Sequence, residues 1–343
     1  MKTALITGIT GQDGAYLARH LLSEGYKVVG TRRRSASSNT WRLEELGISD
    51  QIKLATIEML EFSNILSVIQ ETKPDEIYNL AAQSFVGASF GQPIFTMEVN
   101  AVSVYRLLEA IRIVNPEIKL YQASTSEMYG GVSADSLTEN SKFYPKSPYA
   151  VSKASAHMAT TNYREAHGLF CCNGILFNHE SPLRGAEFVT RKITTNLARI
   201  ALGDDRPLTL GNIEAKRDWG YADDYCRGMH LMMTQDNPDD YVLATGISIS
   251  VREFFQHAAR ELGMKIEFEG DGADESAWDR NSGRCILRID PAQYRPAEVN
   301  TLIGDASKAC NNLAWRPTVD VAKLASLMVR RDLERLKNGQ KIL

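Results

Sequence analysis

The sequence predicts an α/β fold, in which a doubly wound, Rossmann-type parallel sheet is joined to a smaller mixed α/β part. Three observations predict this fold. Apolar stretches of strand length alternate with helical stretches as far as residue 177, a glycine-rich turn follows the first apolar stretch, and the alternation weakens from residue 178. We therefore expect a sheet domain over residues 1–177, to which some later segments return, and a second part mainly over residues 178–343.

The composition is that of an ordinary folded chain. Its 343 residues are 43% hydrophobic and 24% charged, enough for one large domain and a smaller one. A net charge of −3 gives no electrostatic reason to expect a nucleic acid or a membrane surface as partner, and no apolar run approaches the roughly 20 residues of a membrane span. The five cysteines form no CxxC pair and are odd in number, so we expect a reduced, cytoplasmic protein.

A glycine turn separates a short apolar strand at residues 3–7 from a helix at residues 15–24. Glycines there let the backbone approach a pyrophosphate, whose charge is met by the amide groups at the start of the helix. The spacing is GxxGxxG rather than GxGxxG, so a plain tight turn is the alternative. The position favours a dinucleotide site, with the contacts expected from Gly8, Thr10, Gly11, Gln12, Asp13 and Gly14.

The second strand, at residues 26–31, is followed by Arg32, Arg33 and Arg34. A fold that binds NAD often has an acidic residue here for the ribose hydroxyl, whereas arginines suit a 2′-phosphate. A solvated basic loop is the alternative. The position after the second strand favours NADP.

Three further strands are expected at residues 52–57, 76–80 and 119–124, with helices near 63–72 and 96–114. The carboxyl ends of parallel strands lie at one edge of a sheet, where ligands bind. Ala81 and Ala82 would serve helix packing equally well. The residues expected to face the cofactor after the strand at 76–80 are Leu80, Ala81, Ala82, Gln83 and Ser84.

Tyr149 and Lys153 are four residues apart in a stretch without proline or glycine, so on a helix they share one face. A free phenol has a pKa of about 10, and a neighbouring cation lowers it. Tyr149 is therefore a candidate general base or acid, although a solvated pair is the alternative for this spacing alone. Thr125 and Glu127, which follow the strand at 119–124, favour the catalytic interpretation.

Scattered cations mark the second part of the chain. A buried strand at residues 171–177 leads to a polar loop at 178–185 and a helix at 188–202 that carries Lys192. Lys192, Arg217 and Arg295 have the charge that a diphosphate needs, and Glu298 could accept hydrogen bonds from a sugar or base. Each of them alone could be a solvated surface residue. His179 has no second histidine or cysteine at ligand spacing, so we propose no metal site and expect it to bond a cofactor or the backbone.

Several stretches together resemble the extended short-chain dehydrogenase/reductase family and, within it, the GDP-mannose 4,6-dehydratases. They cover nearly the whole chain. The stretches at 178–182 (NHESP) and 216–220 (KRDWG) are more specific than the glycines and argue against a generic reductase. The resemblance is carried by residues 8–14, 31–35, 79–84, 122–130, 173–182, 216–220 and 294–299.

The resemblance implies a catalytic set of Thr125, Tyr149 and Lys153, with Glu127 as the additional residue of the dehydratases. Tyr149 would remove the proton of the sugar C4 hydroxyl while hydride leaves C4 for NADP, with Thr125 holding the oxygen. Glu127 would then take the C5 proton and give one to the departing C6 hydroxyl, after which hydride returns to C6.

The same resemblance implies binding residues and an assembly. The residues implied near NADP are Arg33, Ser84, Lys153, His179 and Arg184. Those implied near the GDP-sugar are Ser84, Thr125, Glu127, Tyr149, Asn178, Val189, Lys192, Arg217, Arg295 and Glu298. Residues 32–42 resemble a segment that reaches the cofactor of a neighbouring subunit, which implies a homotetramer.

Three positions depart from the pattern of the family. Met59 stands where an acid is usual near the adenine, Phe85 where histidine is usual, and Leu183 where arginine is usual. They leave open whether the sugar is mannose or a manno-heptose. A nucleotide-sugar epimerase or 4-reductase is an alternative, against which Glu127 argues. A non-catalytic NADP-binding regulator is another, against which the intact Thr125, Tyr149 and Lys153 argue.

Overall fold

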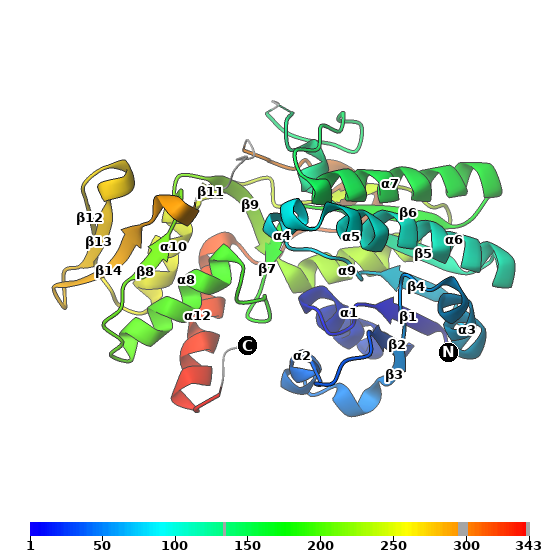
Figure 1. Cartoon of the computed structure of the whole chain (residues 1–343), viewed down its shortest axis with the longest axis horizontal. Helices are drawn as coiled ribbons and strands as arrows, with labels where there is room; N and C mark the ends of the chain where they lie inside the picture. Colours follow the sequence, from blue (N-terminus) through cyan, green and yellow to red (C-terminus); the bar gives the residue numbers. More distant parts are fainter. Residues whose placement is uncertain (133–134, 294–300, 341–343) are drawn as a thin grey trace.

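The computed structural model describes residues 1–132, 135–293 and 301–340. Its larger part is a seven-stranded parallel sheet, covered on both faces by helices (Figure 1). The strands are β1 (Thr3–Thr7), β2 (Lys27–Arg32), β3 (Lys53–Thr56), β4 (Glu76–Asn79), β5 (Lys119–Thr125), β6 (Cys171–Leu176) and β10 (Tyr241–Leu243). They lie in the order β10-β6-β5-β4-β1-β2-β3. The predicted Rossmann-type sheet is confirmed.

Each face of the sheet has its own hydrophobic core, because strands buried on both sides need apolar residues on both sides. One face is covered by α1 (Gln12–Ser23), α9 (Ala222–Met233) and α11 (Ser307–Leu313). The other is covered by α3 (Phe62–Thr72), α6 (Ser103–Val114) and α7 (Pro148–His167). Shorter helices precede β3 or follow β4, namely α2 (Trp41–Glu45), α4 (Val86–Gly91) and α5 (Pro93–Met97).

The strand order reverses direction between β1 and β4, which makes this point the crevice where a parallel sheet of this kind binds its ligand. Thr7 joins the two strand ends. Its hydroxyl donates to Asn79 Oδ1 at 2.7 Å and accepts from the amides of Leu80 and Ala81 at 3.0 Å each. The ends of β1 and β4 are therefore held in one rigid arrangement.

A second lobe has its own core between three helices and a mixed sheet, at the left of Figure 1. The helices are α8 (Val189–Ala201), α10 (Val251–Glu261) and α12 (Val321–Lys337). The sheet consists of β12 (Ile266–Glu269), β13 (Ser276–Asp279), β14 (Arg284–Ile289) and β8 (Leu208–Leu210), in that order. Between the lobes lies a three-stranded sheet of β11 (Ser248–Ser250), β9 (Lys216–Tyr221) and β7 (Asn178–Glu180).

Two local expectations were wrong. The single helix expected at residues 96–114 is composed of α5, a π-helical turn at Glu98–Val102 and α6. The polar loop expected at 178–185 begins as strand β7, because residues 178–180 pair with β9. Later segments do join the main sheet, since β10 pairs with β6 and α9 packs on α1. The division of the chain after residue 177 stays a prediction.

Candidate active site

The glycine turn after β1 is shaped for a close approach of backbone or ligand. Gly8 has φ +70°, and a Cβ there would lie 3.0 Å from Ala81 N. A Cβ at Gly14 would lie 2.5 Å from Gly8 O, so neither position accepts a side chain without movement. Gly11 precedes α1 and has no side chain to cap the first-turn amides, which leaves them available to an anion at this end. The turn therefore fits the pyrophosphate of a dinucleotide.

The first turn of α1 is tied to strand β7. Gln12 donates to His179 O at 3.1 Å and accepts from Ser181 Oγ at 2.7 Å, while His179 Nε2 lies 3.0 Å from Asp13 Oδ2. The other ring nitrogen, Nδ1, bonds Phe177 O at 2.7 Å. Both ring nitrogens of His179 therefore bond protein groups, and its expected role near the cofactor stays a prediction.

Asp13 and His179 form a charged pair. Burial alone would raise the pKa of Asp13, but the charge of His179 and its hydrogen bond lower that pKa to about 2. Burial alone would lower the pKa of His179, and Asp13 outweighs it, so the pKa of His179 is raised. This ion pair holds the start of α1 against β7.

The helix α7 places Tyr149 and Lys153 on one face, as predicted. Ser147 caps the helix by accepting from the amide of Ala150, and Pro148 occupies the first turn, where its missing amide is not needed. Tyr149 and Lys153 are both buried. Lys153 Nζ donates to Ala123 O at 2.9 Å, which places the ammonium beneath the end of β5.

The expectation of a lowered pKa for Tyr149 was wrong for this arrangement. Burial raises the pKa of Tyr149 to about 12, and the neighbouring Thr125 hydroxyl only partly offsets this. Burial also lowers the pKa of Lys153 to about 8. The two shifts have one cause, because a site shielded from water disfavours the charged form of each group.

Thr125 and Glu127 follow directly at the end of β5, next to Tyr149. Thr125 Oγ1 caps the short 3₁₀ helix Ser126–Tyr129 by accepting from the amide of Glu127 at 3.3 Å. That turn directs Glu127 into a cleft between the two lobes, and Thr125 is one of the groups that act on the Tyr149 phenol. The structure thus brings together the hydroxyl, carboxylate, phenol and ammonium that the sequence predicted as a set.

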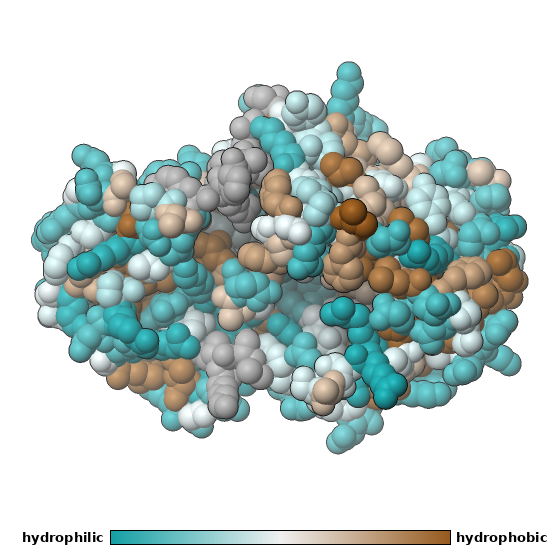
Figure 2. All heavy atoms as spheres, in the orientation of Figure 1, coloured by the Kyte–Doolittle hydropathy of each residue, from teal (hydrophilic) through white to brown (hydrophobic). Residues whose placement is uncertain are grey.

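The cleft has a volume of about 380 Å³, and Figure 2 shows the surface hollowed between the lobes. Five of the residues predicted to contact substrate line it, namely Glu127, Asn178, Val189, Lys192 and Arg217. Lys192 donates to Gln293 Oε1 at 2.6 Å, and burial lowers its pKa. Arg295 and Glu298, which were also predicted here, lie outside the described residues.

One wall of the cleft is aromatic, and sequence reasoning missed most of it. Phe85 and Phe188 meet edge to face with ring centroids 6.3 Å apart, and Phe90 and Trp219 also line the cleft. Phe85 was noticed only as a departure from a pattern. Phe188 carries no sequence signal, because an aromatic residue before a helix is usually part of a core.

Arg184 lies at the edge of this wall. Its guanidinium stacks on Phe188, with 3.5 Å between Cζ and the ring centroid, and its Nε lies 3.1 Å from a carboxylate oxygen of Glu180. Glu180 is buried, lines the cleft and was not predicted as a site residue, although it belongs to the NHESP stretch. Arg184 therefore connects β7 with the start of α8.

The arginines after β2 are arranged in two ways. Arg33 is exposed and Arg32 is partly exposed, so both can reach a ligand at the end of β2. Arg42 instead turns inward within its own chain, donating from Nε to Leu183 O at 2.7 Å and from Nη1 to Thr10 O at 2.9 Å. The side chain of Arg42 is thus bonded within its own chain, and the expectation that residues 32–42 reach the cofactor of a neighbouring subunit stays a prediction.

The structure also places the three departures from the family pattern and the residues predicted to face the cofactor. The side chains of Met59 and Leu183 are both buried in hydrophobic cores, so of the three departures only Phe85 lines the substrate cleft. Ser84 is exposed after β4, and Gln83 is held by the side chain of Asn100, which accepts from its amide at 2.8 Å. Leu80, Ala81 and Ala82 are partly exposed at the crevice.

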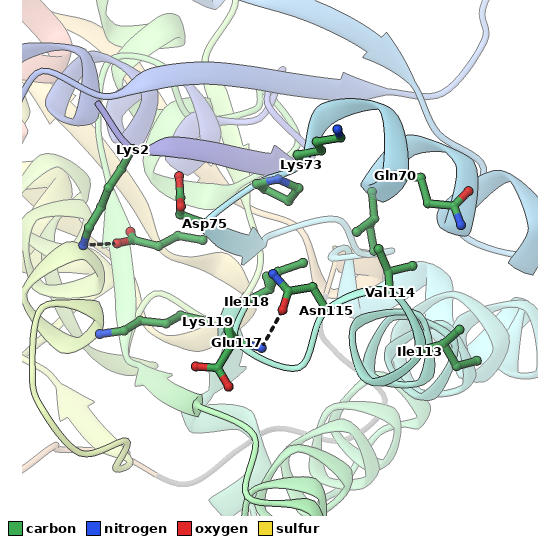
Figure 3. A pocket seen from close by; sticks show the side chains of 13 residues that line it. Lys2, Gln70, Lys73, Asp75, Ile113, Val114, Asn115, Glu117, Ile118 and Lys119 are labelled. Atoms are coloured by element: carbon green, nitrogen blue, oxygen red, sulfur yellow. Dashed lines mark hydrogen bonds and ion pairs between the residues drawn. The ribbon is translucent and has the colours of Figure 1, made fainter.

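A second, larger cleft of about 780 Å³ lies at the opposite edge of the sheet (Figure 3). It is lined by residues at the amino ends of the strands, among them Lys2, Asp75 and Lys119. Ligands of parallel sheets bind at the carboxyl ends, and the catalytic set lies there. The cleft of Figure 3 is therefore not the candidate active site.

Metal-binding clusters and membrane-spanning helices are both absent from the described part of the chain. No group of three histidine, cysteine, aspartate or glutamate side chains could hold a metal ion there. Nor does any of the described helices have the length and apolar character to cross a membrane.

The comparisons with known proteins agree with the resemblance. The family model of GDP-mannose 4,6 dehydratase matches residues 5–328. The GDP-mannose 4,6-dehydratase of Sinorhizobium fredii (strain HH103) is 50% identical over 98% of each chain, and that of Vibrio cholerae is 48% identical over 97% of this chain and 94% of its own.

Solved structures share the fold. A dTDP-glucose 4,6-dehydratase from Bacillus anthracis in complex with NAD has a TM-score of 0.81 at 22% identity, over 99% of this chain and 98% of its own. The family model and the relatives at 48% and 50% identity support the 4,6-dehydratase interpretation over the epimerase alternative. From the matched family model, the relatives near half identity and the catalytic set at the carboxyl end of β5, we conclude that the chain belongs to the GDP-mannose 4,6-dehydratase family.

Proposed function

We propose that the protein converts GDP-mannose, or a GDP-manno-heptose, into the corresponding GDP-4-keto-6-deoxy sugar with loss of one water. One observation carries the proposal. The carboxylate of Glu127 lines the same cleft as Lys192 and Arg217, directly beside the Thr125, Tyr149 and Lys153 set. The cations suit a diphosphate, and a carboxylate next to an oxidation site is what an elimination needs.

The first step concerns the C4 hydroxyl of the sugar. Tyr149 takes the proton of this hydroxyl, Thr125 holds the oxygen, and Lys153 stabilises the phenolate. With a pKa of about 12, Tyr149 gives up its own proton only when further positive charge lies beside the ring. Lys153, whose ammonium also donates to Ala123 O, supplies only part of this charge.

Glu127 then carries the proton transfers that separate a dehydratase from a simple oxidoreductase. The C4 carbonyl acidifies the C5–H bond, so Glu127 takes the C5 proton and gives a proton to the departing C6 hydroxyl. One carboxylate can serve as base and then as acid because the elimination takes up and releases one proton. Water leaves with the C6 oxygen, the hydride taken from C4 is added to C6, and the proton that Tyr149 took from the C4 hydroxyl goes to C5. The balance therefore closes without a net oxidant.

NADP is the cofactor we propose. When bound, an oxidised nicotinamide accepts a hydride from the sugar, returns it and brings a positive ring charge. A Cβ at Gly8 or Gly14 would collide with the backbone of Ala81 or Gly8, so these glycines keep the turn tight at the start of α1, where the amides suit a pyrophosphate. Arg32 and Arg33, at the end of β2, support NADP over NAD because they can pair with a 2′-phosphate.

Mass spectrometry tests the proposal. The purified protein is incubated with NADP and either GDP-mannose or GDP-manno-heptose, while absorbance at 340 nm reports NADPH. Loss of one water without net NADPH supports the dehydratase and identifies the sugar. Accumulated NADPH with a merely oxidised sugar contradicts the role of Glu127, and no reaction with either sugar contradicts the proposed substrate.

We also propose a cytoplasmic homo-oligomer, a tetramer by resemblance. The five cysteines are all free thiols, which suits a reducing compartment. Exposed apolar side chains gather on helices at one side of the sheet lobe, and Figure 2 shows them over α5 and α6. Large exposed apolar patches of this kind mark interaction surfaces. The patch consists of Ile94, Phe95, Tyr105, Val151 and Met158.

A further inference from the structure

The segment at residues 182–184, between β7 and α8, is held by arginines from three different helices. Arg42 of α2 donates to Leu183 O at 2.7 Å. Arg191 of α8 donates to Pro182 O at 3.0 Å and to Arg184 O at 2.9 Å, and Arg335 of α12 donates to Pro182 O at 2.7 Å. Every carbonyl of this segment thus accepts from a guanidinium. We call Arg42, Arg191 and Arg335 the arginine clamp.

The carboxylates of Asp332 and Glu45 hold two arginines of the clamp in position. Asp332 of α12 is fully buried and accepts from Arg191 Nε at 2.9 and 3.0 Å and from Arg335 Nη1 at 2.9 Å. Glu45 of α2 accepts from Arg335 Nε at 3.1 Å. The C-terminal helix is therefore connected to α2, almost 300 residues earlier in the chain.

Stability alone does not account for this arrangement. Arg191 and Asp332 have no exposed surface, and burial lowers the pKa of Arg191 and brings that of Arg42 to about 10. Buried ion pairs are expensive to desolvate, and apolar residues of equal volume often stabilise a protein as well or better. What guanidinium groups on backbone carbonyls do provide is a defined position for the segment that they hold.

The clamp reaches the glycine turn directly. Arg42 bonds Thr10 O at 2.9 Å with Nη1 while its Nε bonds Leu183 O. A second connection runs from Ser181 Oγ to Gln12 Oε1 at 2.7 Å. A shift of the segment at residues 182–184 would thus be passed to the turn that fits a pyrophosphate.

We propose that the arginine clamp positions the dinucleotide site, so that Arg335, on the C-terminal helix, tunes the affinity for the cofactor without touching it. Arg335 acts through residues 182–184 on the glycine turn and on Arg184. The inference rests on the proposed use of a dinucleotide at this turn. Arg42, Arg191 and Arg335 are positioning residues and not catalytic ones.

The test compares cofactor affinity in variants of one helix. Calorimetry gives the Kd of NADP for the full chain, and steady-state kinetics give KM for GDP-mannose and kcat at saturating NADP. We expect R335M to raise the Kd of NADP about tenfold, which corresponds to about 1.4 kcal/mol of binding free energy. KM for GDP-mannose and kcat at saturating NADP should stay close to the wild-type values, because Arg335 does not line the substrate cleft.

Matched variants separate positioning from folding. Arg330 lies on the same helix, is exposed and pairs with Glu261, so R330M should leave the Kd unchanged. R335K keeps the charge and should recover part of the affinity. If R335M does not fold, E45Q serves in its place, because it replaces the carboxylate of one partner of Arg335. A raised Kd of NADP in E45Q supports the inference, and an unchanged Kd overturns it.

The outcomes distinguish this inference from the proposed function. A wild-type protein that binds no NADP contradicts the proposed cofactor. A wild-type protein that binds NADP, together with folded variants of lowered thermal midpoint and unchanged Kd, shows that the clamp only stabilises the fold and overturns the inference. A rise in KM for GDP-mannose alone also overturns it, because the clamp would then act on the substrate cleft.

Discussion

Tyr149 and Lys153 are both buried at the end of β5, and burial acts on each against its charged form. The phenol keeps its proton up to a pKa of about 12, whereas the ammonium loses its own near a pKa of about 8. Catalysis by a phenolate instead needs a lowered pKa for Tyr149 and an ammonium that stays charged at Lys153. Additional positive charge at the ring, together with the ammonium, must therefore outweigh the desolvation of the phenolate.

Tyr149→Phe tests the role of the phenol. Removing only the hydroxyl should lower kcat at least about 100-fold, the usual contribution of a positioned acid or base, because nothing then takes the C4 proton. The Kd of NADP should stay near that of the wild type, as calorimetry will measure. Near-normal turnover would exclude Tyr149 as the base.

Glu127→Gln tests the elimination. The amide keeps the size of the side chain but cannot take the C5 proton, so water loss should fall about 100-fold or more. Some oxidation at C4 should survive, and NADPH should accumulate at 340 nm while mass spectrometry detects no loss of water. Normal water release by this variant would mean that another group is the base.

The pH dependence follows from Lys153. Burial lowers its pKa to about 8, so the ammonium that stabilises the phenolate is present below this pH and lost above it. We expect kcat/KM for GDP-mannose, measured from pH 6 to pH 10, to fall above about pH 8. In Lys153→Arg this alkaline limb should be absent, because a guanidinium stays charged. A wild-type profile still rising at pH 9 would contradict the assignment.

At the scale of elements, local sequence patterns predicted the strands of the main sheet. They could not predict elements that form only by pairing with a distant segment. The ranges of β1 and α3 agree with the sequence predictions to within about one residue, since strands buried on both faces and amphipathic helices leave strong periodic signals. Strand β7 has three residues and forms by pairing with β9, about 40 residues later, so no local signal marks it. The aromatic wall of the cleft could not be predicted for the same reason, because Phe85 and Phe188 meet only in the folded chain.

The same distinction holds for the site. Glu127 and Tyr149 could be predicted because parallel strand ends meet at one edge and a helix repeats every four residues. The inward direction of Arg42 could not, since its partners Thr10 and Leu183 belong to two distant segments. The pKa of Tyr149 was mispredicted because a sequence shows the nearby cation but not the depth of burial.

The segment after β2 carries the prediction on cofactor choice. In a variant with both Arg32→Ala and Arg33→Ala, we expect the Kd of NADP to rise about tenfold or more while the Kd of NAD changes little. The reason is that hydrogen bonds between charged groups and a phosphate contribute roughly 1.5–3 kcal/mol each. Calorimetry with both dinucleotides measures the ratio. Arg280→Ala, an exposed arginine of the far sheet, is the control, and equal loss for NAD and NADP would argue against 2′-phosphate recognition.

At the scale of the whole molecule, chain segments from both halves build the sheet lobe, and the C-terminal helix ties the second lobe to it. β10, from the second half, completes the sheet of the first, and α12 is bonded to α2 through Arg335 and Glu45. The substrate cleft lies between two separate hydrophobic cores and takes residues from each side. The relative position of the lobes therefore determines the geometry of the cleft.

The apolar patch on the sheet lobe carries the prediction on assembly. Ile94 of α5 is 80% exposed and Met158 of α7 is 58% exposed, on two helices that pack against each other. Water contact with such side chains is unfavourable, so a second copy of the chain covering them gains the burial energy. We expect light scattering to find an oligomer for the wild type and a smaller species for a variant with both Ile94→Glu and Met158→Glu. Ile247→Glu, at an exposed residue just before β11 and away from these helices, should leave the assembly intact. A double variant of unchanged mass would mean that the subunits associate through another face.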